Sequence, residues 1–168
     1  MRFLPPAVLL AFSLAPAQEF LFEPRVSVGS DFQMGVRAGA GGFLPNESLV
    51  MGFLDLEARP VAHAVRVRES PSFSYQYREI RLGVGPGISW AQALGNGFAA
   101  TMSVGVHYSD GDYWGSNRDP ASGWFGWAEA GLRYMLTDES YFGLAYQHHP
   151  LPGISPSRVL FQYGWRFR

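Results

Sequence analysis

The sequence contains no cysteine and no lysine, and neither sign of charge is in large excess. Without cysteine, no disulfide bond can support the fold. The formal net charge of −1 excludes a generally basic nucleic-acid-binding protein, so we expect no nucleic-acid partner. Because lysine is absent, all 13 basic residues are arginines. Arginine is always charged and pairs bidentately with carboxylates, which suits a packed ionic interior.

Long apolar stretches are also missing. No run of the roughly eighteen apolar residues that a transmembrane helix requires occurs after residue 17. Residues 1–17 are themselves typical of a secretory signal peptide, with a charged head at Arg2, an apolar region over 3–14 and a small-residue cleavage pattern at Ala15-Pro16-Ala17. We therefore expect residues 18–168 to form one exported domain.

What the sequence has in abundance is period-two alternation, which is clearest over residues 158–168. One phase of this segment is apolar or aromatic and consists of Val159, Phe161, Tyr163, Trp165 and Phe167. The other phase carries Arg158, Gln162, Gly164 and Arg166, with Leu160 as the apolar exception. Such alternation predicts a β-strand with one apolar and one polar face.

Similar alternation recurs along the chain and predicts eight strands. We expect them within residues 26–41, 49–59, 61–69, 73–90, 98–108, 124–136, 142–147 and 158–168. Compact turns are expected at Arg59-Pro60, 92–97 and 137–140, and longer loops at 110–122 and 149–156. If the strands form an up-and-down sheet, longer loops are expected at one of its ends. The connections at 42–48 and 69–72 are short for that end.

The two faces of these strands indicate the solvent on each side. Aromatic residues make up 15% of the chain and gather near the predicted strand ends, as in the interfacial girdles of membrane barrels. The sequence therefore predicts an all-β protein, an eight-stranded antiparallel up-and-down transmembrane β-barrel in the bacterial outer membrane. The last strand would close against the first, and the partners of this monomer would be outer-membrane lipid and lipopolysaccharide. The alternative is a soluble exported sandwich or ligand-binding barrel with its apolar face inside.

In the membrane interpretation, the polar phase of each strand faces a narrow lumen. The inward-facing charged residues are then Arg37, Asp55, Glu57, Arg59, Arg66, Arg68, Glu79, Arg81, Glu129, Arg133, Arg158 and Arg166. Opposite charges in such a confined space must pair. They would form either a salt-bridged plug or a polar, porin-like path for small solutes.

Two local features invite a metal-site interpretation. The loop over 110–119 is rich in oxygen ligands but lacks the order and closing glutamate of an EF-hand. His148 and His149 lie at the end of the seventh predicted strand, and the strand phase points His148 to lipid and His149 to the lumen. Neither has an adjacent carboxylate or third histidine in the sequence. We expect no metal and no cofactor.

Residues 123–168 resemble the lipid A 3-O-deacylases of the PagL type, which are acyloxyacyl hydrolase-like outer-membrane barrels. The resemblance rests on Gly131-Leu132-Arg133-Tyr134, on the segment from Gly143-Leu144 to His148-His149, and on the aromatic last strand. It implies an eight-stranded barrel with a Ser-His-Glu arrangement on its lipid-facing wall, in which His148 is the histidine. The serine position falls at Pro150 and the glutamate near Arg158, so these two positions depart from the family pattern.

A serine hydrolase requires a hydroxyl nucleophile next to a base. Ser157 shares the outward face with His148 across the last hairpin, so His148 and Ser157 are the candidate catalytic residues. Two functions follow. The first is a small outer-membrane barrel without enzymatic activity, with a structural, adhesion or limited permeation role. The alternative is a lipid A 3-O-deacylase-like acyl hydrolase acting on the lipid-facing wall.

Overall fold

The computed structural model describes residues 19–28, 32–67, 73–109, 123–150 and 156–167, and within them every regular element is a β-strand. The strands are β1 (Glu19–Val28), β2 (Gln33–Phe43), β3 (Leu49–Val67), β4 (Phe73–Gly95), β5 (Phe98–Ser109), β6 (Gly123–Met135), β7 (Ser140–His148) and β8 (Ser157–Phe167). No helix among the described residues is long and apolar enough to cross a membrane.

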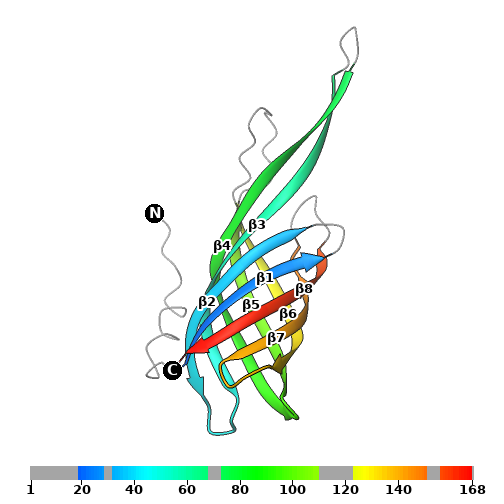
Figure 1. Cartoon of the computed structure of the whole chain (residues 1–168). Coiled ribbons are helices and arrows are strands. Elements are labelled where there is room, and N and C mark those ends of the chain that lie inside the picture. Colours follow the sequence, from blue (N-terminus) through cyan, green and yellow to red (C-terminus); the bar gives the residue numbers. More distant parts are fainter. Residues whose placement is uncertain (1–18, 29–31, 68–72, 110–122, 151–155, 168) are drawn as a thin grey trace.

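The eight strands form a closed antiparallel barrel in which each strand pairs with its neighbours in sequence and β8 pairs with β1 (Figure 1). This confirms the predicted eight-stranded up-and-down transmembrane barrel fold. The seam between β1 and β8 is interrupted beside Pro24, since pairing stops at Phe22 with Trp165 and resumes at Arg25 with Gln162. Proline has no N–H to donate to a ladder.

Two of the predicted strand positions are wrong, and the errors cancel in the count. The segment from Glu19 to Val28 is a strand, and it is β1 rather than the predicted 26–41 strand that closes the barrel against β8. The predicted turn at Arg59-Pro60 is absent, because residues 49–67 form the single strand β3. At the second place, proline was a misleading turn signal. The last β3 residue that pairs with β2 is Ala58, and Pro60 lies beyond it. The missing N–H of Pro60 therefore removes no backbone hydrogen bond to β2.

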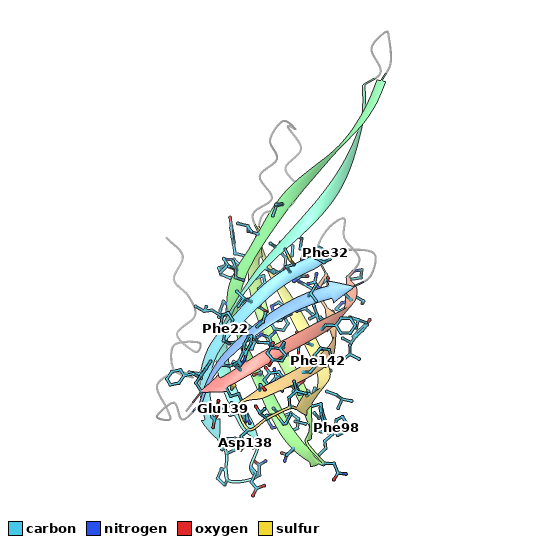
Figure 2. All side chains as sticks on the ribbon, viewed as in Figure 1. Phe22, Phe32, Phe98, Asp138, Glu139 and Phe142 are labelled. Atoms are coloured by element: carbon cyan, nitrogen blue, oxygen red, sulfur yellow. The ribbon has the colours of Figure 1, made fainter. Side chains whose placement is uncertain are left out.

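Corrected in this way, successive connections alternate between the two ends of the barrel, and the two longest, 110–122 and 149–156, share one end. The turns at 44–48, 96–97 and 136–139 lie at one end of the barrel, which we call the short-turn end. Connection 42–48, which the sequence placed on the loop side, belongs to this end. The 96–97 turn is a two-residue hairpin with positive φ at Asn96 (52°) and Gly97 (78°), which is the type I′ geometry that suits strand twist. Asp138 and Glu139 lie at this end (Figure 2).

At the opposite end the β3–β4 hairpin extends far beyond the barrel wall (Figure 1). Strand β2 pairs with β3 only as far as Ala58, and β5 pairs with β4 only from Gly83. Beyond these residues β3 and β4 pair only with each other, up to Val67 and Phe73. We call this two-stranded part, residues 60–67 and 73–80, the projecting hairpin.

The strands alternate between an apolar outer wall and a polar interior, as predicted. Large apolar side chains are exposed around the wall, among them Leu54, Leu82, Met102, Val104, Leu132 and Leu144. Aromatic pairs lie towards both ends of the wall, with ring centroids 4.9 Å apart for Phe98–Tyr134 and 5.6 Å apart for Tyr108–Trp124. A soluble barrel would bury this apolar set, so the outer surface has the character of a lipid-facing wall.

Candidate functional site

The interior of the barrel holds most of the charges that the strand phase directed there. Seven of the predicted residues are buried: Arg37, Asp55, Glu57, Arg59, Glu129, Arg133 and Arg158. Arg166 is half-buried at the short-turn end. The side chains of Arg66, Arg68, Glu79 and Arg81 lie outside the described residues.

The centre of the lumen is an ion-pair network around Arg37, which is completely buried. Its guanidinium contacts three carboxylates, with Nη2 3.2 Å from Asp55 Oδ2 and 3.3 Å from Glu129 Oε2, and Nη1 3.4 Å from Glu23 Oε1. Arg25 joins the same carboxylates, at 2.6 Å from Asp55 and 3.2 Å from Glu129. Because these residues come from β1, β2, β3 and β6, the network crosses the lumen.

Aromatic rings fill the remaining space beside this network. The guanidinium carbon of Arg37 lies 4.0 Å from the ring centroid of Phe53 and 5.3 Å from that of Trp127. A Cβ added at Gly105 would lie 2.6 Å from the Trp127 ring. Glycine on β5 therefore makes room for the Trp127 indole, and the lumen at this level is filled by side chains.

Towards the short-turn end, Glu23 joins the network to a second cluster. Arg133 Nη2 lies 2.8 Å from Glu23 Oε2, and the Tyr141 hydroxyl donates a hydrogen bond to the same oxygen. The Arg133 guanidinium also stacks over the Tyr141 ring at 4.4 Å. Below these residues lies a small apolar cluster of Leu21, Leu49, Met51 and Tyr141.

At the other side of the Arg37 network, towards the projecting hairpin, a third cluster of polar side chains surrounds Glu57. Its carboxylate contacts Arg59 and lies 3.3 Å from His107 Nδ1 and 3.7 Å from Arg158 Nη2. The Nδ1 atom of His149 lies 2.6 Å from Arg59 Nη2 and 2.9 Å from Arg158 Nη2. Both arginines can donate to this nitrogen, so His149 acts as their acceptor in the lumen, on the face that the sequence predicted for it.

Glu57, His107 and His149 are the described residues that could hold a metal ion, since their ligand atoms lie within 4.8 Å of one another. Two histidines and a carboxylate are a common transition-metal ligand set. Here, however, Arg59 Nη2 bonds to both Glu57 and His149 Nδ1. A guanidinium group already supplies the positive charge between these two ligands, so we assign no metal to this cluster.

Sequence reasoning missed several residues of this interior. Glu23 and Arg25 were overlooked because the strand containing them was not predicted. The signal was present, since Phe20, Phe22 and Val26 alternate with Glu19, Leu21, Glu23, Arg25 and Ser27. His107 lies in the polar phase of the 98–108 segment, together with Thr101 and Ser103, but nothing in that segment indicates that its side chain contacts Asp55 and Glu57.

The structure brings the two candidate catalytic residues together on the outer wall. His148 and Ser157 face each other in the β7–β8 register, and His148 Nδ1 lies 3.2 Å from Ser157 Oγ. Within the described part of the chain, His148 has no carboxylate partner. Arg158, near which the glutamate of the resembling family would fall, points into the lumen and donates to Gln147 Oε1 at 2.7 Å. The oxygen-rich loop at 110–119 and the expected signal peptide, residues 1–17, lie outside the described residues.

Comparison of the sequence with protein-family models and with curated proteins gives no match. Solved structures do match. The N-terminal β-barrel domain of Pseudomonas aeruginosa OprF aligns with a TM-score of 0.61 and 14% identity, over 90% of this chain and 98% of that chain. The Yersinia pestis outer membrane protein Ail in a nanodisc gives 0.56 and 11%, over 89% and 99%. The outer membrane enzyme PagL gives 0.44 and 13%, over 88% and 99%. For OprF and Ail, the likeness at these identities concerns the fold of small outer-membrane barrels, whereas the PagL alignment, with a TM-score below 0.5, carries no argument.

Proposed function

We propose that this chain is an outer-membrane protein whose sealed barrel anchors the projecting hairpin at the cell surface, with a structural or adhesive role. The observation that carries this proposal is the two-stranded hairpin rising from a barrel that is apolar outside and filled with ion pairs inside. Lipid and lipopolysaccharide would contact the outer wall. The short-turn end would face the periplasm, as it does in bacterial outer-membrane barrels.

The projecting hairpin suits binding because its edges are open. Outside the barrel, β3 and β4 have no third strand among the described residues, so each presents unpaired backbone N–H and C=O groups along its outer edge. A partner with an exposed strand could extend this ribbon by β-augmentation.

A permeation role is less well supported than a structural one. The Arg37 network spans the lumen from β2 to β6, and the Phe53 and Trp127 rings lie directly against it. Solute passage would require these ion pairs to separate in a confined space, which is energetically costly.

Shortening the hairpin tests the proposal. Replacing residues 61–79 with Asn-Gly keeps Pro60 and Ile80 as the flanking pair and introduces a favoured two-residue turn. We expect the variant to reach the outer membrane and to show the heat-dependent gel migration of a folded barrel, while cell-surface adhesion is lost. A shortened protein that adheres as well as the full chain would contradict the adhesive role. A full-length protein found only in soluble fractions would contradict the proposal that the barrel anchors the hairpin in the outer membrane.

A second candidate function, lipid A acyl hydrolysis, is favoured by one observation: the 3.2 Å contact between His148 Nδ1 and Ser157 Oγ on the exposed wall. A histidine at this distance can accept the proton of an attacking serine hydroxyl. Expression in a host of known lipid A, followed by mass spectrometry, separates the two functions. Loss of one acyl chain that is abolished in both His148→Ala and Ser157→Ala would establish the hydrolase; unchanged lipid A would exclude it.

A further inference from the structure

The lumen is not filled at the short-turn end. A cavity of about 310 Å³ opens there, and its wall includes residues of every strand from β2 to β8. Small side chains create the space, because the inward positions Ala91, Ala93 and Ala99 carry only a methyl group. We call this cavity the vestibule.

The inner part of the vestibule is apolar. Leu49 and Tyr141 line it and belong to the buried apolar cluster, and Met135 lines it while packing against that cluster. The inner wall thus offers aliphatic and aromatic surface at the base of a space that is open at its other side. Apolar groups from a ligand would be removed from water on entering it.

Two guanidinium groups and one carboxylate, that of the exposed Glu47, also line the vestibule. Arg133 is 5% exposed, and its Nε has no hydrogen-bond partner among the described residues. Arg166, nearer the opening, donates from Nη2 to the carbonyl of Asp138 at 3.1 Å, while its buried Nε also has no such partner. Arg133 is paired with Glu23, whereas Arg166 has no ion pair within the described part of the chain. Buried donors of this kind are rarely left without an acceptor.

We propose that the vestibule binds a single-chain fatty carboxylate, with its alkyl chain among Leu49, Met135 and Tyr141 and its carboxylate at Arg166. The volume lies at the lower end of the range for ligand pockets, which suits one short chain. Guanidinium and carboxylate groups pair through two parallel hydrogen bonds. This site is at the opposite end of the barrel from the projecting hairpin and does not depend on its role.

The ligand test uses soluble eight-carbon probes and the folded full-length barrel in lipid nanodiscs. Backbone amide shifts of Ala91, Ala93 and Ala99 are followed by NMR during titration with octanoate, octanol, octylamine and octyl phosphate. We expect saturable shifts with octanoate, affinity about tenfold lower for octanol, and no saturation with octylamine. Hexanoate should bind more weakly than octanoate, because each buried methylene contributes about fourfold in affinity.

Two variants and one control locate the site. Arg166→Gln should reduce octanoate affinity about tenfold and leave octanol affinity unchanged, whereas Ala93→Leu should fill the vestibule and abolish saturation by both. Ala130→Leu, on the exposed outer wall, should have no effect. If Ala93→Leu does not fold, Ala99→Leu serves the same purpose. Unsaturable shifts, equal octanoate binding in Arg166→Gln, or tighter binding of octyl phosphate than of octanoate would each overturn the proposal.

Discussion

Arg37 and Glu129 meet across the lumen although they are 92 residues apart in the sequence, with Arg37 Nη2 3.3 Å from Glu129 Oε2. Arg37 comes from β2 and Glu129 from β6, so this contact joins walls that are not neighbours in the sheet. Both side chains are almost completely buried. Their pairing depends on closure of the barrel and makes the interior a single connected network.

Arg37→Met should destabilise the barrel by about 3–5 kcal/mol, because it leaves the carboxylates of Glu23, Asp55 and Glu129 short of a buried counter-charge. Arg37→Lys should also destabilise it, but less, since lysine keeps the charge and loses the planar fork of donors. Urea unfolding in lipid vesicles, followed by tryptophan fluorescence, measures both. Glu139→Gln removes an exposed charge at the short-turn end and should unfold like the wild type. Equal stability of Arg37→Met and the wild type would show that the network does not hold the barrel together.

The filled centre of the lumen predicts a barrel that does not conduct ions. In a planar bilayer at neutral pH, the full-length protein should give no steady conductance steps, while a general porin measured in the same chamber does. The reason is that the Arg37 ion pairs and the Phe53 and Trp127 rings occupy the lumen at one level. Regular openings by the wild-type protein would contradict the sealed interior and support permeation instead.

The Tyr141 ring lies directly against Gly164 on the next strand. A Cβ at Gly164 would lie 2.2 Å from the ring carbon Cζ of Tyr141. Gly164→Val should therefore displace the ring and destabilise the barrel by about 1–3 kcal/mol, as overpacking does. Gly126→Val is the matched control, because a Cβ there meets nothing within 4 Å. A difference in urea midpoint between the two variants is expected, and equal midpoints would argue against this packing.

The sequence could predict which face of its strand each side chain occupies. Alternation correctly placed His148 outside and His149 inside, and it assigned Arg37, Asp55 and Glu129 to the interior. This works because neighbouring side chains along a strand point to opposite faces whatever the strand pairs with. Proline was a poorer guide. Pro60 divided β3 in the prediction, because Arg59-Pro60 was interpreted as a turn before the pairing of its neighbours was known.

The partners of the interior residues could not be predicted. Which side chains meet across a barrel depends on strand tilt and stagger, and a local pattern carries neither. His107 on β5 illustrates this, because it contacts Asp55 and Glu57 of β3, which is not adjacent to β5 in the barrel. The vestibule is a second example, since its walls come from seven strands and the alanines that form it are unremarkable in sequence.

The central claim is that the apolar wall faces lipid and the charged wall faces the lumen, and the absence of cysteine allows a direct test. Single cysteines at Leu54, Leu132 and Leu144 on the wall, and at Ala145 in the interior, can each carry a spin label in lipid vesicles. Oxygen concentrates in lipid, so its effect on EPR relaxation should be strong for labels at the three outer positions and weak for the label at position 145. A water-soluble nickel chelate should relax none of the three outer labels. Strong relaxation of these outer labels by the nickel chelate would show that water surrounds the wall, and would contradict the membrane barrel.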